Sequence, residues 1–396
     1  MGSRRSSYCN LICSGVIIGL LPLQIDTFEG MNFMRPLFGF LLFFISFQSL
    51  KAQKDRTSIN SSRSLITNSI KKESDFKFLP IPYINFNRSL GFSLGAVPIA
   101  MYTLNKSDTI SPSSTSGGIG FYTTSDSWFA VQFNTWYLNE DRYRIKLSGG
   151  LGNINFQFYL EHPISPGYID YNTTAEFFTM EVQRKLHKKL YLGAHYSYSK
   201  VSTDFDINNQ PTQVDFFQSI GLVSSIDTRD NVYYPYKGFL SEINYTSFPE
   251  FLDNPYISQK FEIDYNPFFQ SENDQNIWAN RLYVGFGIGD LGFSQQFVVG
   301  RTDIRGYTLG KYRGNQIIAI QSEYRFNPYK KLGFVGFAGV ATVFGAINDS
   351  DNGLLLPGMG LGVRYVVFEE NHMNMGMDIA VGKGDWGLYF KIGESF

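Results

Sequence analysis

The sequence predicts an all-β protein, a transmembrane antiparallel β-barrel of about 16 strands, and three observations lead to this fold class. Aromatic residues are 17% of the 396 residues, with 38 glycines, and charged residues are only 17%. From about Leu90 onward, segments of roughly ten residues alternate apolar and polar side chains, with turn residues between them. Short connections then alternate with long ones. Amphipathic strands with one face toward lipid explain all three observations.

The alternation predicts strands near 90–104, 115–125, 127–138, 141–150, 153–160, 173–186, 189–202, 214–226, 238–248, 256–267, 277–289, 315–326, 333–345, 357–368, 373–382 and 386–396. Their number is even, as bacterial single-chain barrels require. All four tryptophans fall near predicted strand ends, where aromatic girdles lie. A soluble β-sandwich explains the alternation, but not the aromatic content, the loop lengths and the leader together.

Loop lengths predict the orientation. The connections around 125–127, 187–189 and 327–331 are short, whereas those around 161–172 and 290–314 are long. Short turns are periplasmic and long loops extracellular in such barrels. We therefore expect a protein of the Gram-negative outer membrane, in contact with outer-membrane lipid, with both barrel termini on the periplasmic side.

Residues 1–53 are expected to be a leader with a signal peptide. Arg35 precedes an apolar run at 37–47, and a polar exit follows. This order is typical of secretion signals, and the run is shorter than the roughly 20 residues of a spanning helix. Either translation starts at Met31 or Met34, or residues 1–30 are an unusual leader.

Two further segments complete the predicted organisation. Residues 54–89 are expected to be a polar periplasmic linker, in which 76–88, with Pro80 and Pro82, form an extended segment or fold into the barrel mouth. Residues 90–396 are expected to be the transmembrane β-barrel. Both cysteines, Cys9 and Cys13, lie in the leader, so the barrel contains no disulfide and no thiolate metal site.

Four stretches of the barrel stand out. Residues 227–238 read DTRDNVYYPYKG, 299–307 read VGRTDIRGY, and 322–326 read SEYRF. The chain ends in GLYFKIGESF, where alternation places Leu388, Phe390, Ile392 and Phe396 on one face and Tyr389, Lys391 and Ser395 on the other. In order, spacing and context, these stretches resemble the BamA/TamA superfamily of outer-membrane barrels, the bacterial surface antigen family, which includes the two-partner secretion translocators.

The resemblance implies roles for particular residues. It implies sixteen strands and a sixth extracellular loop that folds into the lumen, where the arginine of a motif similar to Arg305-Gly306-Tyr307 meets acidic groups on the inner wall. The periplasmic turn motif corresponds to Asp227, Arg229, Asp230, Pro235 and Gly238. The C-terminal assembly signal, which the barrel assembly machinery reads during biogenesis, corresponds to Phe390, Ile392, Gly393 and Phe396.

The acidic partner of Arg305 departs from the family pattern. In strand 315–326, Glu323 and Arg325 share the face opposite Ile318 and Ile320, so they are the candidate loop partners in the lumen. The next strand usually carries Phe-x-Asp-x-Gly, but Gly339 stands in place of that aspartate. Glu323 is therefore expected to serve alone.

The resemblance implies that the protein assists insertion or export of proteins, or lipid handling, at the outer membrane. Family members carry periplasmic POTRA domains, but 54–89 is shorter than the roughly 50 residues of a small domain. We therefore expect a barrel-only member and a periplasmic partner that supplies the POTRA-like function. The alternative from another class is a passive pore or structural barrel plugged by loop 290–314.

An enzyme is not expected, and an outer-membrane hydrolase is the less favoured reading. None of the four histidines has a Ser and an Asp nearby in a recognisable arrangement, so no catalytic residue is assigned. No P-loop or HExxH motif appears, and neither a cofactor nor a metal is expected; Asp349 and Asp351 are expected in a solvated turn. The net charge of −1 gives no reason to expect nucleic-acid binding.

Overall fold

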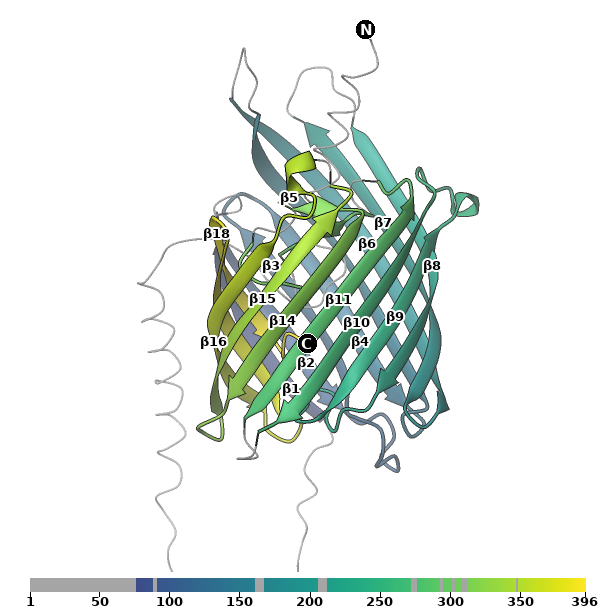
Figure 1. Ribbon diagram of the computed structural model, residues 1–396, viewed down its shortest axis with the longest axis vertical. Helices are drawn as coiled ribbons and strands as arrows, with labels where there is room; N and C mark the ends of the chain where they lie inside the picture. Colours follow the sequence, from purple (N-terminus) through teal and green to yellow (C-terminus); the bar gives the residue numbers. More distant parts are fainter. Residues whose placement is uncertain are drawn as a thin grey trace, which may run out of the picture.

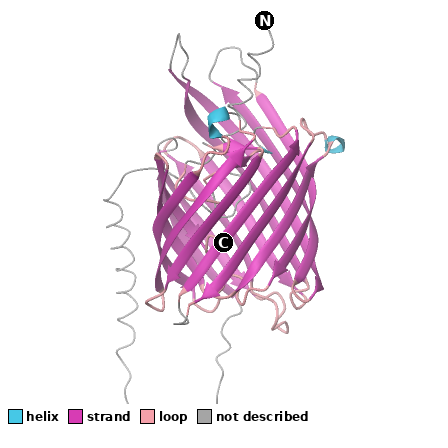
Figure 2. Cartoon of the chain, viewed as in Figure 1, coloured by secondary structure: helices cyan, strands magenta, loops and turns pink. Residues whose placement is uncertain are grey.

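The protein is a β-barrel built from one antiparallel sheet of 16 strands, seen in a computed structural model (Figures 1 and 2). The structure describes residues 76–87, 91–160, 167–205, 212–271, 276–292, 295–300, 303–307, 312–346 and 348–396. Strand order follows the chain throughout, which confirms the predicted fold class. The predicted leader and residues 54–75 lie outside the described residues. No helix among the described residues is long and apolar enough to cross a membrane.

The strands of the large sheet are β1 (Phe76–Asn87), β2 (Gly91–Tyr102), β3 (Ser114–Thr123), β4 (Trp128–Leu138), β5 (Tyr143–Leu160), β6 (Gly167–His187), β7 (Leu190–Phe205), β8 (Gln213–Asp227), β9 (Gly238–Phe248), β10 (Ser258–Gln270), β11 (Ile277–Gly289), β14 (Gln316–Phe326), β15 (Leu332–Phe344), β16 (Leu356–Phe368), β17 (Met373–Gly382) and β18 (Asp385–Ile392). A separate ribbon pairs β12 (Phe297–Val298) with β13 (Arg313–Gly314). The described residues also hold two 3₁₀ helices, Glu250–Leu252 and Asp349–Asp351.

The strands differ from the predicted ones in two places, but the total of 16 is unchanged because one difference adds a strand and the other removes one. The barrel begins with β1 and not at residue 90, because Phe76–Asn87 pairs with β2 along its whole length. Its prolines, Pro80 and Pro82, lack a backbone N–H, and β1 is the first strand in the sheet order, where proline is tolerated.

The second difference is that the predicted strands 141–150 and 153–160 are one strand, β5. Its glycines suggest a break in the sequence, but they make room for aromatic rings instead. A Cβ atom would lie 2.5 Å from the Phe177 ring at Gly150 and 2.3 Å from the Phe129 ring at Gly152.

The strands β5 to β8 rise above the rest of the barrel (Figure 1). They have 18, 21, 16 and 15 residues, whereas a tilted strand needs only about 9–11 to cross a membrane. Pairing of β5 with β4 stops at Asn153. On the outward face, exposed Leu151 and Phe178 give way beyond this level to Asn172 and Thr174. These strands therefore continue out of the apolar belt into water.

The inward face differs between three sectors of the barrel. The inward face of β1 to β4 carries an apolar cluster, which contains Val97, Ile99, Phe121 and Phe129 and extends to Met375 of β17. The wall of β5 to β11 instead carries ion pairs such as Lys146–Glu181 at 3.0 Å and Arg281–Asp264 at 2.7 Å. A third sector, formed by β14 to β18, holds the candidate site.

Candidate functional site: the loop docked inside the barrel

The connection between β11 and β14 folds back into the barrel. It starts and ends on the β12–β13 ribbon, and between these strands Val299, Ile304 and Tyr307 are fully buried. They pack against Ile317 of β14, Ala341 and Val343 of β15, and Leu356 of β16. The loop is therefore part of the barrel interior. Arg301 and Lys311 lie outside the described residues.

Glycines in the loop and in the barrel wall let the backbone of the loop approach the wall closely. A Cβ atom added at Gly358 would lie 2.4 Å from the carbonyl oxygen of Arg305. A Cβ atom added at Gly382 would lie 2.6 Å from the carbonyl oxygen of Gly306. Gly306 has φ +110°, and its own Cβ would lie 2.6 Å from the carbonyl carbon of Val381. A left-handed conformation in so little space suits glycine alone. Gly339 also belongs to this surface, since its Cβ would lie 2.9 Å from Ile304 Cδ1.

The guanidinium of Arg305 is held by three acceptors from two strands. Nη2 donates to Glu323 Oε2 at 2.7 Å, Nε to Gln321 Oε1 at 3.2 Å, and Nη1 to Asp378 Oδ2 of β17 at 2.5 Å. Its Cζ also lies 3.3 Å from the centroid of the Phe337 ring. The expectation that Glu323 serves alone is wrong, because Asp378 supplies a second carboxylate. Both acids are fully buried.

Asp378 was not predicted from the sequence, because the motif of the resembling family has its acidic residue on the strand that contains Gly339. It is the single acidic residue of β17, MNMGMDIAVG. An isolated carboxylate in an otherwise uncharged strand was the available signal.

Arg305 joins a larger buried ion network, which comprises Arg305, Arg325, Arg364, Lys391, Glu323, Asp378 and Glu394. Arg325 Nε donates to Glu323 Oε1 at 2.9 Å, and Arg364 Nε to Glu394 Oε2 at 3.0 Å. Arg364 also bonds Asp378, and Lys391 Nζ lies 3.1 Å from Asp378 Oδ2. Buried charges need such pairing, because an unpaired one loses its hydration without compensation.

The rest of the motif has its own partners. The Gly306 N–H donates to Tyr389 Oη of β18 at 2.6 Å. Tyr307 Oη donates to the Pro357 carbonyl at 2.6 Å and accepts from the Lys383 N–H at 3.0 Å. Arg305, Gly306 and Tyr307 thus bind β14, the start of β16, β17 and β18.

The C-terminal residues follow the predicted alternation only as far as Ile392. Phe390 and Ile392 are half-buried and pack on the apolar cluster of β1 to β4. The strand then ends, and at Gly393, with φ +87°, the chain turns inward. Phe396, predicted on the outward face, packs against Tyr234, Phe268 and Ile277, and its carbonyl accepts from Arg325 Nη2 at 3.0 Å. The period of two applies only within a strand, so it failed beyond Ile392.

The turn between β8 and β9 is held by its acidic residues. Asp227 accepts from Arg229 Nε at 2.9 Å and from Arg144 Nη1 of β5 at 2.7 Å. Asp230 Oδ1 accepts from the Tyr236 N–H at 3.0 Å, Pro235 is buried, and Gly238 has φ +95°.

This turn reaches other parts of the barrel end. Tyr233 Oη lies 2.8 Å from Thr115 Oγ1 of β3, and Tyr234 Oη accepts from Asn327 Nδ2 at 2.8 Å. Strands far apart in the sheet are therefore tied together at this end.

The histidines form no recognisable active site among the described residues. His195 faces the lumen, with Nε2 3.1 Å from Thr246 Oγ1. Within the described part of the chain, no group of three or more His, Cys, Asp or Glu side chains is placed to hold a metal ion. His162 lies outside the described residues.

Comparison with known families decides the membership of the chain. The Omp85 superfamily domain matches residues 113–396. The chain belongs to the Omp85 superfamily. This membership places the Omp85 barrel in the outer membrane, in agreement with the resemblance noted in the sequence. No curated protein matches the chain.

Solved structures share the fold of this Omp85 barrel at low identity. BamA from Haemophilus ducreyi lacking POTRA domains 1–3 is similar with a TM-score of 0.50 and 11% identity, over 87% of this chain and 77% of that one. CdiB from Acinetobacter baumannii gives 0.54 and 13%, over 80% and 59%. CdiB from Escherichia coli gives 0.53 and 10%, over 80% and 62%. The chain spans less than two thirds of either CdiB chain.

Proposed function

We propose that this Omp85 barrel assists the insertion or export of proteins, or handles lipid, at the outer membrane. The observation that carries the proposal is the docking of Arg305, Gly306 and Tyr307 on β14, β16, β17 and the last strand, β18. A loop that only fills space has no need of a fully buried guanidinium with two carboxylates. Such an arrangement fixes a single conformation of the loop.

The two ends of the sheet are where a client chain would be received. Phe390 and Ile392 of β18 meet the apolar cluster of the first strands, and Lys77 Nζ lies 2.5 Å from Glu370 Oε2 at the β16–β17 turn. Only eight residues form β18, against twelve in β1. A short strand joined through side chains suits a seam at which an extended client segment adds by strand pairing.

The proposal includes an orientation and partners. Both barrel termini would face the periplasm, with the Asp227–Gly238 turn on that side. Phe390, Ile392, Gly393 and Phe396 would serve the barrel assembly machinery as a recognition signal before the last residues fold inward. A separate periplasmic protein would recruit clients in place of POTRA domains.

Depletion of the protein in its native host tests the proposal. We expect lower levels of a subset of outer-membrane or secreted proteins, or altered lipid asymmetry, restored by the native chain and not by Arg305→Ala. If the outer-membrane proteome, the secreted proteins and lipid asymmetry all stay unchanged, the proposal is wrong.

A passive pore or structural barrel is the second candidate, because the loop fills the lumen with the apolar cluster of Val299, Ile304 and Tyr307. Removal of residues 291–312 should then raise single-channel conductance in planar bilayers. A deleted barrel that folds and conducts no more than the native one would refute the plug.

A further inference from the structure

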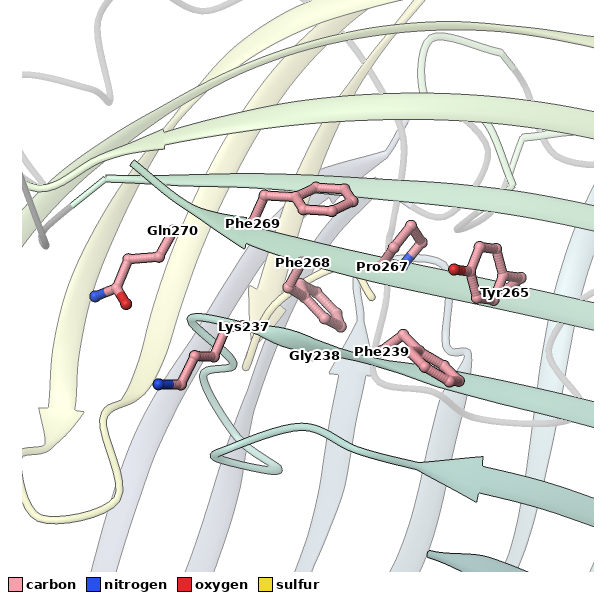
Figure 3. Close-up of a pocket in the computed structure, with 8 residues that line it drawn as sticks. All are labelled: Lys237, Gly238, Phe239, Tyr265, Pro267, Phe268, Phe269 and Gln270. Atoms are coloured by element: carbon pink, nitrogen blue, oxygen red, sulfur yellow. The ribbon is translucent and has the colours of Figure 1, made fainter. Parts of the chain in front are cut away.

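The outer wall carries a pocket that the docked loop does not involve. It has a volume of about 480 Å³ and is lined by Lys237, Gly238, Phe239, Tyr265, Pro267, Phe268, Phe269 and Gln270 (Figure 3). Proline interrupts the sheet here, since Pro267 has no N–H to donate. The β10–β11 ladder pairs Tyr265 with Leu282 and resumes only at Phe268 and Ala279. A local gap in the ladder thus accompanies the pocket.

Most of the lining belongs to the lipid-facing side. Tyr265, Pro267 and Phe269 share one face of β10, where Tyr265 is 38% and Phe269 58% exposed. Asn266 and Phe268, which point the other way, are 4% and 2% exposed. Phe239 pairs with Pro267 across the β9–β10 ladder and so lies on the same face as Pro267. The pocket therefore opens on the membrane side of the wall.

The polar residues lie at one end of the pocket. Lys237 closes the β8–β9 turn and Gln270 ends β10, both exposed, and Figure 3 shows them together at one end with Phe239 and Tyr265 at the other. Trp278, 50% exposed, is paired with Phe269 and lies 4.7 Å from the Tyr324 ring. Exposed Trp and Tyr rings mark the membrane–water interface. The pocket thus spans the boundary between headgroups and acyl chains.

Lys237 has a positive charge without an ion-pair partner within the described residues. Gln270, the last residue of β10, lies at the same end of the pocket. An apolar, aromatic groove with a cation at its interfacial end complements an amphiphile with an anionic head. A peptide segment suits it poorly, because the outward face offers few partners for a peptide backbone at membrane depth.

We propose that this pocket binds an anionic phospholipid. The phosphate contacts the Lys237 ammonium, and one acyl chain lies against Phe239, Pro267 and Tyr265. In the proposed orientation this is a lipid of the periplasmic leaflet. The site itself depends neither on that orientation nor on a role in insertion or export.

Lipid retention by the purified full-length barrel tests the site. The barrel in detergent is incubated with equal amounts of phosphatidylglycerol and phosphatidylcholine with matched chains, and bound lipid is counted by native mass spectrometry. We expect preferential retention of phosphatidylglycerol. Lys237→Gln should lower it about fivefold, the contribution of one lysine near an anionic surface. Lys237→Arg should keep it.

The control is Lys189→Gln, which removes an exposed lysine from the β6–β7 turn at the same end of the barrel, away from the pocket. It should leave retention unchanged. Each variant is first shown to be folded by the heat-dependent gel mobility of the barrel. A photoactivatable phosphatidylglycerol should cross-link within 237–239 or 265–270. Equal retention of the two lipids, equal effects of Lys189→Gln and Lys237→Gln, or cross-links spread evenly over the outer wall would each overturn the proposal.

Discussion

Replacement of Asp378 by asparagine would remove one carboxylate from the site of Arg305 with almost no change in side-chain shape. Asp378 accepts from Arg305 at 2.5 Å, lies 3.1 Å from Lys391, and also bonds Arg364. All four side chains are almost completely buried. The substitution leaves their charges without one of the three carboxylates of the network, so we expect the docked loop to be destabilised.

The size of the effect follows from the contacts that remain. Removal of one partner from a buried ion pair costs about 3–5 kcal/mol. Arg305 keeps its 2.7 Å bond to Glu323, which favours the lower end of that range. About 3 kcal/mol corresponds to roughly a 100-fold larger undocked population, because each 1.4 kcal/mol is tenfold.

Trypsin can measure this population in reconstituted vesicles. Arg305 and Arg313, both buried, supply cleavage sites in the loop. Cleavage requires the loop to leave the barrel interior, so its initial rate follows the undocked fraction when docking is fast. Mass spectrometry of the fragments separates loop cleavage from cleavage elsewhere. Asp378→Asn should accelerate loop cleavage by one to two orders of magnitude, roughly in proportion to the expected population.

Glu181→Gln is the matched control. Glu181 also faces the lumen, but its partner at 3.0 Å, Lys146, has a side chain 47% exposed, and so exposed a pair contributes little. This variant should be cleaved at the native rate. If Asp378→Asn behaves like Glu181→Gln while both barrels remain folded, the assignment of Asp378 to loop docking is wrong.

Four further outcomes are expected. Glu323→Ala should accelerate loop cleavage more than Asp303→Ala, because Glu323 contacts both Arg305 and Arg325; equal rates would count against this. Gly339→Asp should loosen the loop and not strengthen it, since its Cβ would lie 2.4 Å from the Ile320 oxygen, and a slower cleavage rate would contradict the steric reasoning. Gly306→Ala should weaken loop docking by roughly 1–3 kcal/mol, because alanine is strained in the backbone conformation of this residue. The rate of loop cleavage by trypsin, compared with that of the native barrel, measures this effect. Asp227→Asn should lower the temperature at which the barrel loses its heat-dependent gel mobility, because it weakens two arginine contacts at the β8–β9 turn; an unchanged transition would refute that role.

The strand pattern in the sequence was sufficient for the fold class, because outward side chains alternate with inward ones in every strand. It was less reliable at strand ends. Gly149, Gly150 and Gly152 resemble a turn. Only the aromatic rings across the sheet, which sequence alone does not place, show why Gly150 and Gly152 are needed within β5. Pro80 and Pro82 suggest a linker, but proline is tolerated in the first strand of the sheet order, where a missing backbone N–H costs few ladder hydrogen bonds.

The contacts of the site were harder to predict than its residues. Alternation placed Glu323 in the lumen, but it could not align β14 with β17, which are separated by two strands. That alignment depends on the pairing registers of the intervening strands. Asp378 and Tyr389 became visible as partners of the loop only when these registers were known.

The hydrogen bond between Gly306 and Tyr389 has a thermodynamic consequence. It connects the loop to β18, and Asp378 connects both Arg305 and Lys391 of β18 to one carboxylate. Any event that displaces β18 therefore weakens loop docking, and release of the loop makes displacement of β18 easier by the same free energy, because linkage is reciprocal. Protease sensitivity of the loop therefore also depends on how firmly β18 is held in the barrel.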